Sequence, residues 1–188
     1  ANLKIKIENL KESIENNSAM PYAVKAILNN PKLTGIHNAL GNILEIEEQY
    51  TTAITTVLGP AVSNIITSTE QSAKEAIQFL KNNNYGRATF LPINILKPKE
   101  IDIQTKQLLE TLPGYINTAQ QLVAYDPIFT TIVQNQLGNV LVVDTIDHAN
   151  HISKQINYRY RIVTLEGELL HVGGSITGGN KLKTRSAL

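Results

Sequence analysis

The chain has 188 residues with 17 basic and 16 acidic side chains, and a formal net charge of +1 gives no overall field that would draw the whole molecule onto nucleic acid or an anionic membrane. It contains no cysteine, which excludes disulfide frameworks, thiolate zinc sites and cysteine nucleophiles. The longest clean apolar run, at residues 140–143, is far shorter than the ~20 residues of a membrane span. No secretory leader pattern opens the sequence, and because its first residue is Ala1, we expect a piece of a longer protein.

The first predicted element is a helix over residues 1–19 with a narrow apolar stripe. Leu3, Ile7, Leu10 and Ile14 are spaced four, three and four residues apart, which is the a/d pattern of a heptad. Two heptads fit either the end of a coiled coil or an amphipathic helix docked on its own domain. The thin stripe favours the coiled coil, and we expect this helix to pair with the basic tail at the other end of the chain.

The middle of the chain contains an internal repeat of strand and helix units. In each copy a helix ends at a Leu-Gly pair, a short apolar strand follows, a threonine opens a second helix, and an arginine leads the closing strand. The matched positions, first copy then second, are Gly59 and Gly138, Thr69 and Thr145, and Arg87 and Arg161. Strands alternating with helices are typical of α/β units rather than of an all-β sandwich. We therefore predict a mixed α/β fold.

The matched glycines and threonines indicate where each helix ends or begins. We expect Gly59 and Gly138 to stop their helices in the left-handed conformation that glycine adopts easily. Thr69 and Thr145 follow short apolar strands, so their hydroxyl groups are predicted to cap the next helices.

The repeat also predicts the domain organisation. A Pro-bearing segment at residues 92–98 joins the two copies, so we place two related subdomains at residues 20–105 and 106–180, packed as one unit. Apolar strand positions of the second copy are predicted to lie in the core: Leu141, Val143, Ile162 and Val163.

Four glycines in seven residues make residues 173–179 the sharpest feature of the sequence. A P-loop would need Gly-Lys-Ser/Thr, whereas Gly179 is followed by an asparagine and then by a lysine without the hydroxyl residue. The glycine spacing does not give the G-x-G-x-x-G dinucleotide fingerprint. A nucleophile elbow around Ser175 would need glycine where Thr177 stands. These three enzyme motifs are therefore excluded.

Close approach of another backbone is the interpretation that we favour for this segment. A β-branched core between two glycine pairs can form an edge strand that pairs with a partner chain, because the glycines carry no Cβ to keep that chain away. The alternative is a merely flexible loop. The predicted interface residues are Gly173, Gly174, Ser175, Ile176, Thr177, Gly178 and Gly179.

Other candidate sites are weaker. Residues 140–144 resemble the magnesium-holding strand of nucleotide hydrolases, but no P-loop precedes them. His148 and His151 have helical i, i+3 spacing, yet neither cysteine nor a nearby glutamate completes a zinc site, so we interpret them as surface histidines. The acidic run at residues 45–48 is predicted to be exposed. We find no catalytic residues and no metal site.

Basic residues gather at the two ends of the chain. Lys181, Lys183 and Arg185 lie within the last eight residues with no acidic residue among them, and Lys4 and Lys6 lie near the start. If the two ends meet, these charges form one patch that could neutralise DNA phosphates. The alternative is a pair of ordinary solvated helix ends.

Several segments together resemble one family. Residues 85–92, Tyr-Gly-Arg-Ala-Thr-Phe-Leu-Pro, resemble a strand of the hinge domains of structural maintenance of chromosomes (SMC) proteins. Residues 122–126, 137–144 and 163–168 resemble the second half of the same hinge, and so does the glycine segment at residues 173–179. The resemblance extends over nearly the whole chain.

The resemblance implies two pseudo-symmetric subdomains that form an SMC hinge, flanked by the ends of an antiparallel coiled coil at residues 1–19 and 181–188. It implies a doughnut-shaped homodimer in which the glycine edge pairs with the other subdomain of the partner. The implied function is homodimerisation of a bacterial SMC chromosome-condensation and segregation ATPase, with accessory DNA binding that is not sequence-specific near the coiled-coil junction. The alternative is a pure dimerisation module without DNA contact.

The same resemblance implies a non-catalytic domain that has no cofactor of its own. ATP and magnesium would bind at the heads of the parent protein, and kleisin and associated subunits would bind elsewhere on that protein. The implied localisation is cytoplasmic and nucleoid-associated, without a membrane partner.

Overall fold

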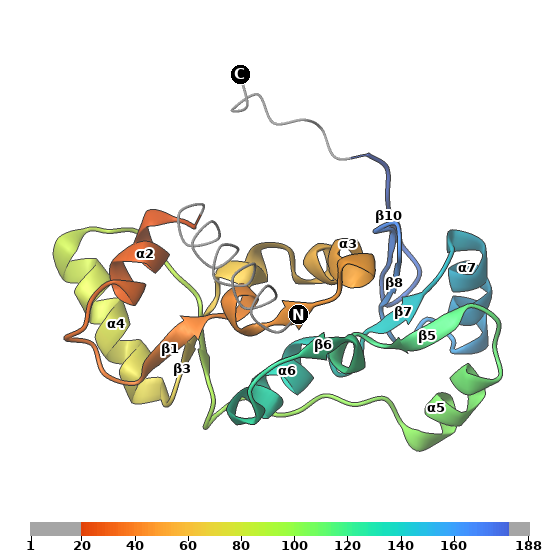
Figure 1. Cartoon of the computed structure of the whole chain (residues 1–188), viewed down its shortest axis with the longest axis horizontal. Coiled ribbons are helices and arrows are strands. Elements are labelled where there is room, and N and C mark those ends of the chain that lie inside the picture. Colours follow the sequence, from red (N-terminus) through yellow and green to blue (C-terminus); the bar gives the residue numbers. More distant parts are fainter. Residues whose placement is uncertain (1–19, 181–188) are drawn as a thin grey trace, which may run out of the picture.

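The computed structural model describes residues 20–180, which form an elongated molecule with one β-sheet in each half (Figure 1). Helices cover the outer side of each sheet, and further helices lie in the centre. The predicted coiled-coil ends at residues 1–19 and 181–188, and their mutual pairing, lie outside the described residues.

The first half contains a three-stranded sheet with strand order β1-β3-β4. Strand β1 is antiparallel to β3, and β4 is parallel to β3. The elements of this half are α2 (Tyr22–Leu28), β1 (Ile36–Ala39), η1 (Leu40–Ile43), β2 (Glu45–Ile46), α3 (Glu48–Leu58), η2 (Gly59–Ser63), β3 (Ile65–Thr67), α4 (Glu70–Asn83) and β4 (Phe90–Pro92), where η is a 3-10 helix. Strand β4 therefore begins at Phe90, three residues later than its predicted start at Arg87.

The second half contains a five-stranded sheet with strand order β10-β9-β8-β7-β5. Its strand pairs β5 with β7 and β7 with β8 have the same directions as the pairs of the first sheet. The elements of this half are α5 (Ile103–Glu110), β5 (Tyr115–Thr118), η3 (Ala119–Leu122), β6 (Val123–Ala124), η4 (Pro127–Phe129), α6 (Thr130–Leu137), β7 (Leu141–Val143), α7 (Ile146–Gln155), β8 (Ile162–Thr164), β9 (Leu169–Leu170) and β10 (Ile176–Thr177). Strands β9 and β10 have no counterpart in the first sheet.

The predicted repeat is visible in local detail. Thr69 caps α4 by accepting a hydrogen bond from the Ser72 amide at 3.1 Å, and Thr145 caps α7 by accepting one from the His148 amide at 3.3 Å. The first strand of each sheet carries a register irregularity at the same place, between Ile36 and Asn38 in β1 and at the matching residues of β5. Two pseudo-symmetric subdomains are thus confirmed, while their boundaries at residues 105 and 106 stay a prediction.

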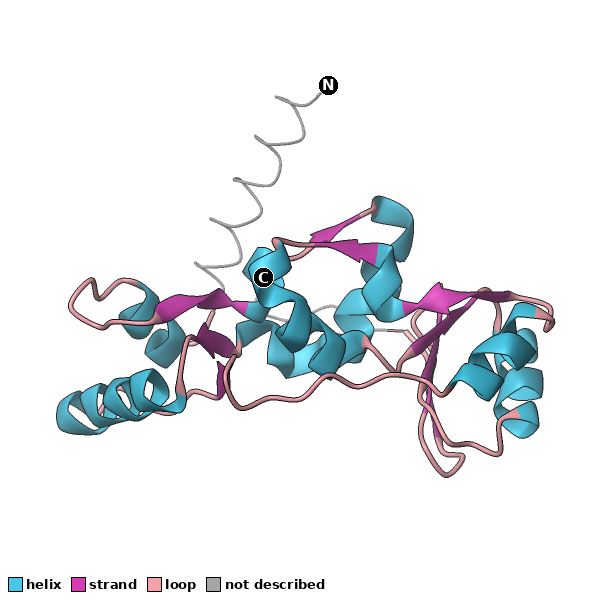
Figure 2. Cartoon of the chain, turned by 90° about the horizontal axis from the view of Figure 1, so that it is seen from below, coloured by secondary structure: helices cyan, strands magenta, loops and turns pink. Residues whose placement is uncertain are grey.

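A two-stranded antiparallel ribbon joins the halves. Glu45 of β2 lies opposite Ala124 of β6, and Ile46 lies opposite Val123. Figure 2 shows this ribbon on one side of the molecule, away from both larger sheets.

Both halves contribute to a central hydrophobic core. Leu40, Ile54 and Ile66 from the first half pack with Ile132 and Val142 from the second, and all five are fully buried. A smaller cluster lies outside the centre in each half. The four predicted core residues, Leu141, Val143, Ile162 and Val163, are fully buried. Neither half encloses this central core alone, so the two subdomains form one packed unit.

The two matched glycines end their helices in different ways. Gly59 has a positive φ of +50°, but its ψ of −131° is not that of the predicted left-handed conformation. Gly138 has φ = −69°, so the predicted left-handed conformation is wrong there. Glycine is needed at this position because a Cβ would overlap the carbonyl oxygens of Lys99 and Gln134. The linker between the halves crosses the end of α6 at this point, and the Lys99 amide donates a hydrogen bond to the carbonyl oxygen of Gln134.

Candidate functional site

The glycine segment at residues 173–179 forms an open sheet edge, as its sequence predicted. Within it, β10 is the outermost strand of the five-stranded sheet and pairs only with β9, with Ile176 opposite Leu170 (Figure 1). No other strand of the described chain pairs with the outer side of β10. The backbone groups on that side are therefore placed to take up a further strand.

Backbone conformation explains why glycine occupies three of the four glycine positions in this segment. Gly173, Gly174 and Gly179 have φ of +90°, +117° and +120°, in the left-handed region that other residues avoid. The Gly174 amide donates to the carbonyl oxygen of His171 at 3.0 Å, which closes the turn between β9 and β10. A Cβ at Gly173 or Gly179 would meet no atom of the described chain within 4 Å. Packing inside this protomer does not require glycine there, so the space beside these residues is free.

Large apolar side chains are exposed beside the glycines. Val172 and Ile176 expose 62% and 53% of their surface, and Tyr158, whose ring lies near Gly174, exposes 37%. Apolar groups gathered at one place on a surface commonly mark an interaction site.

A second open edge belongs to the first half. The repeat makes β4 the counterpart of β8, but β8 pairs with β9 on its outer side, whereas β4 has no strand there among the described residues. Arg87 and Thr89, which lead into β4, are exposed. The two sheets thus begin with matching outermost strands, β1 and β5, but end at unlike ones, β4 in the first and β10 in the second.

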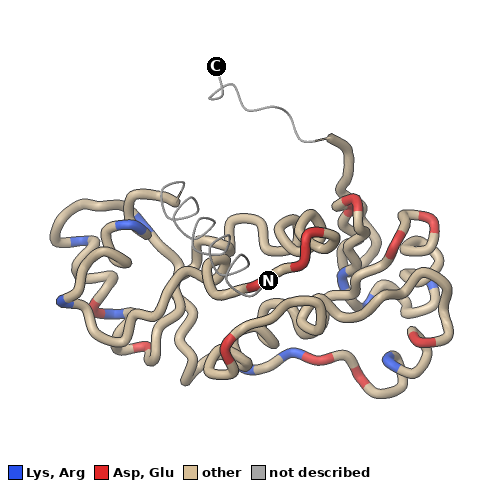
Figure 3. The backbone as a smooth tube through the Cα atoms, viewed as in Figure 1, with Lys and Arg blue, Asp and Glu red and all other residues tan. Residues whose placement is uncertain are grey.

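The predicted DNA-binding residues, Lys181, Lys183, Arg185, Lys4 and Lys6, lie outside the described residues. The described charges are nevertheless unevenly distributed. Residues 33–73 and 107–153 contain no lysine or arginine at all. Figure 3 shows the basic residues in the outer parts of the molecule and along the linker, where acidic residues also lie, while the start of α3 and the surroundings of the ribbon carry acidic residues alone. The centre of the molecule is therefore acidic.

His148 is involved in a local hydrogen bond. Its Nδ1 lies 2.7 Å from Asp144 Oδ1, and this hydrogen bond lowers the pKa of Asp144. Gly114 packs against the pair, where a Cβ would overlap both side chains. Within residues 20–180, no three histidine, aspartate or glutamate side chains are grouped so as to hold a metal ion.

A polar cluster that the sequence analysis missed attaches α5 to the second sheet. Asp102 caps α5 by accepting hydrogen bonds from the hydroxyl and amide of Thr105, at 2.7 and 3.0 Å, and a third from Tyr160 at 2.9 Å. These bonds, together with Arg159 at 3.5 Å, lower the pKa of Asp102 to about 2. Tyr160 and Arg159 lie more than 50 residues from Asp102 in sequence, which is why spacing alone could not reveal the cluster.

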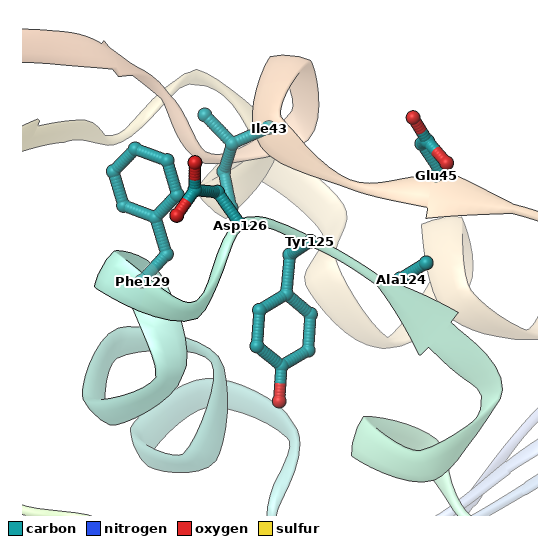
Figure 4. Close-up of a pocket in the computed structure, with 6 residues that line it drawn as sticks. All are labelled: Ile43, Glu45, Ala124, Tyr125, Asp126 and Phe129. Carbon is teal, nitrogen blue, oxygen red and sulfur yellow. The ribbon is translucent and has the colours of Figure 1, made fainter.

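A cavity of about 470 Å³ opens beside the ribbon, where both halves meet (Figure 4). It is lined by Ile43, Glu45, Ala124, Tyr125, Asp126 and Phe129. The sequence analysis did not find it because its walls come from segments that are about 80 residues apart.

Comparison with protein families gives a match over most of the core. The family model described as "SMC proteins Flexible Hinge Domain" matches residues 33–153. "Chromosome partition protein Smc" of Bacillus subtilis (strain 168) is 38% identical over 172 residues, which cover 91% of this chain and 14% of that protein. The protein of the same name from Mesomycoplasma hyorhinis is 38% identical over 183 residues, covering 97% of this chain and 19% of that protein. The chain thus spans less than a fifth of the length of these relatives.

Solved structures show the same fold. The crystal structure of an asymmetric dimer of the Geobacillus stearothermophilus SMC hinge domain has a TM-score of 0.88 at 35% identity, covering 96% of this chain and 75% of that chain. The Pyrococcus furiosus SMC hinge domain has a TM-score of 0.69 at 28% identity, covering 95% of this chain and 93% of that chain. Among the described helices, none is both long and apolar enough to span a membrane.

Proposed function

This chain belongs to the family of SMC protein hinge domains, and from that premise we propose that it is the homodimerisation hinge of an SMC chromosome-partition protein. The related Geobacillus hinge is described as a dimer, and the curated relatives are chromosome partition proteins. The observation that carries the proposal is the pair of unlike open edges, β10 in one half and β4 in the other. Because open edges accept further strands, two copies of the chain can complete each other.

In the proposed dimer, β10 of one protomer pairs with β4 of its partner. The five-stranded sheet of one protomer then continues into the three-stranded sheet of the other. A closed two-fold arrangement forms this contact twice and leaves neither edge open. The exposed side chains of Val172 and Ile176 become buried, and the free space beside Gly173 and Gly179 admits the partner. The result is a ring of two protomers.

The absence of cysteine permits a direct test by cross-linking. Thr177→Cys in β10 and Thr89→Cys at β4 introduce two thiols, and we expect mild oxidation to give a disulfide-linked dimer because paired strands bring Cβ atoms close enough. Each single variant, and Thr177→Cys combined with Glu75→Cys on α4, serves as a control and should stay monomeric on a non-reducing gel.

Light scattering on the unmodified 188-residue chain completes this test. A monomeric mass would contradict dimerisation itself. A dimeric mass without the specific cross-link would place the interface at other surfaces.

We further propose accessory DNA binding through Lys181, Lys183, Arg185, Lys4 and Lys6. The absence of lysine and arginine from residues 33–73 and 107–153 is compatible with this assignment, because the acidic centre repels phosphates and all basic residues lie outside it, those at the ends of the chain included. With three to five phosphate contacts, the logarithm of the DNA binding constant should fall with the logarithm of the salt concentration at a slope of roughly −3 to −4.5 on duplex DNA. We expect no sequence preference. Reversal of the three tail charges to glutamate should abolish this binding. Unchanged binding would contradict this assignment of residues, whereas no DNA binding by the unmodified chain would favour the alternative, a hinge that only dimerises.

The parent protein enters the proposal only as context. We propose that this non-catalytic domain binds no cofactor, and that ATP, magnesium, kleisin and associated subunits bind to other parts of a protein that acts at the nucleoid in the cytoplasm. The share of the relatives that the chain covers, 14% and 19%, leaves ample length for those parts.

A further inference from the structure

The cavity beside the ribbon is independent of the two edges proposed to form the dimer. Its walls come from η1 and β2 of the first half and from β6 and η4 of the second (Figure 4). Ile43 and Phe129 supply apolar surface, while Glu45 and Asp126 carry carboxylates into its lining. The cavity therefore combines apolar contact area with negative charge.

The walls of the cavity are held in place by contacts of their own. Phe129 is only 8% exposed and belongs to the central core, and its ring meets the His37 ring edge-on at a centroid distance of 5.5 Å. The Tyr125 hydroxyl accepts a hydrogen bond from Gln120 at 3.1 Å. Asp126 accepts one from the Ile128 amide at 3.0 Å, which fixes the start of η4. The shape of the cavity is thus formed before any partner arrives, which lowers the entropic cost of binding.

Among residues 20–180, no ion pair involves the carboxylates of the cavity. The ion pairs that form among the described residues hold Asp102 and Asp144, not Glu45 or Asp126. Every lining residue also lies within the two segments, residues 33–73 and 107–153, that contain no lysine or arginine. Glu45 and Asp126 are both exposed, so an incoming cation can reach them.

We propose that this cavity is the docking site for a basic segment of a partner protein, in which lysine or arginine alternates with an apolar residue. The aliphatic stem of a lysine packs on apolar surface while its charged head stays with polar groups, and the lining offers both, Ile43 and Phe129 together with the two carboxylates. The same negative charge excludes nucleic acid from this face. Charge complementarity therefore selects a basic peptide among the possible occupants.

A fluorescein-labelled hexapeptide of alternating lysine and leucine is a suitable probe, added to the full 188-residue chain. We expect its binding to shift the backbone amide NMR signals of Ile43, Glu45 and Ala124. Glu45→Gln combined with Asp126→Asn should weaken binding about two- to thirtyfold, because each exposed ion pair contributes about 0.2–1 kcal/mol, and asparagine keeps the cap on η4 because it accepts the same hydrogen bond. Glu75→Gln combined with Glu100→Gln changes the net charge equally at distant exposed positions and should leave binding unchanged.

A second variant separates the cavity from diffuse charge attraction. Ala124→Phe fills the cavity without changing a charge, so it should also weaken peptide binding. Equal binding by this variant, or by the peptide of alternating glutamate and leucine, would overturn the proposal. So would a change of oligomeric mass in the Glu45/Asp126 variant, because the cavity would then be covered by a second copy of the chain. Thermal unfolding followed by circular dichroism confirms that each variant is folded.

Discussion

Truncation of one exposed side chain should weaken the proposed dimer by a predictable amount. Ile176 lies in the edge strand β10 and exposes 53% of its surface in the single chain. The proposed pairing with β4 of the partner would bury that surface. Ile176→Ala removes most of the side chain but keeps a residue that a strand tolerates, so the fold of each protomer should persist.

The exposed fraction sets the size of the effect. Complete burial of an isoleucine stabilises by about 1.5–3 kcal/mol, and the 53% that is still exposed corresponds to about half of that. A two-fold dimer contains the contact twice, so the loss is about 1.6–3.2 kcal/mol. At ~1.4 kcal/mol per factor of ten, the dimer Kd should rise about 15- to 200-fold.

Sedimentation equilibrium over a dilution series measures this Kd. Ile103→Ala is the matched control, because Ile103 is an exposed isoleucine of α5, which forms no part of either edge strand, and it should leave the Kd unchanged. Circular dichroism confirms that both variants are folded. A folded Ile176→Ala variant with the Kd of the wild-type chain would show that β10 does not carry the interface.

Three further predictions concern stability. Gly138→Ala should lower the free energy of unfolding by about 1–3 kcal/mol, measured by urea titration, because its Cβ overlaps the linker carbonyl of Lys99. Thr145→Ala should lower the free energy of unfolding by about 1 kcal/mol because it removes the cap of α7. Thr145→Ser keeps a capping hydroxyl group and should have a melting temperature close to that of the unmodified chain. The folded pKa of Asp102, about 2, lies below its usual 3.8, so its stabilising effect is present above pH 4 and is lost as the pH falls toward 2. The free energy of unfolding should accordingly fall less between pH 4 and pH 2 in Asp102→Asn than in the unmodified chain. The same pH dependence in both proteins would contradict the stabilising role of the Asp102 carboxylate.

Local chemistry was readable from the sequence where a residue acts on its own neighbours. Thr69 and Thr145 cap helices through amides three residues away, and such spacing is visible in a single chain. The β-branched residues between glycine pairs likewise indicated an edge strand, and Ile176 lies in one. Gly138 was misjudged because its constraint comes from Lys99, a residue of the linker rather than of its own helix.

Features formed by distant segments were not readable. The ribbon consists of two-residue strands, too short for any alternation of apolar and polar residues to appear. The cavity unites Ile43 with Phe129, and the cluster around Asp102 depends on Tyr160. Each of these arrangements follows from the way in which the two halves fold together, which no local pattern records.

The shared central core has a mechanical consequence. Because Leu40 and Ile54 of one half are packed against Ile132 of the other, a pull that separates the halves must expose this core all at once. The proposed contact between protomers depends instead on short edge strands, of three residues in β4 and two in β10. Tension applied across the proposed ring would therefore part the protomers from each other before it deformed either of them, and each protomer would survive such an event ready to close the ring again.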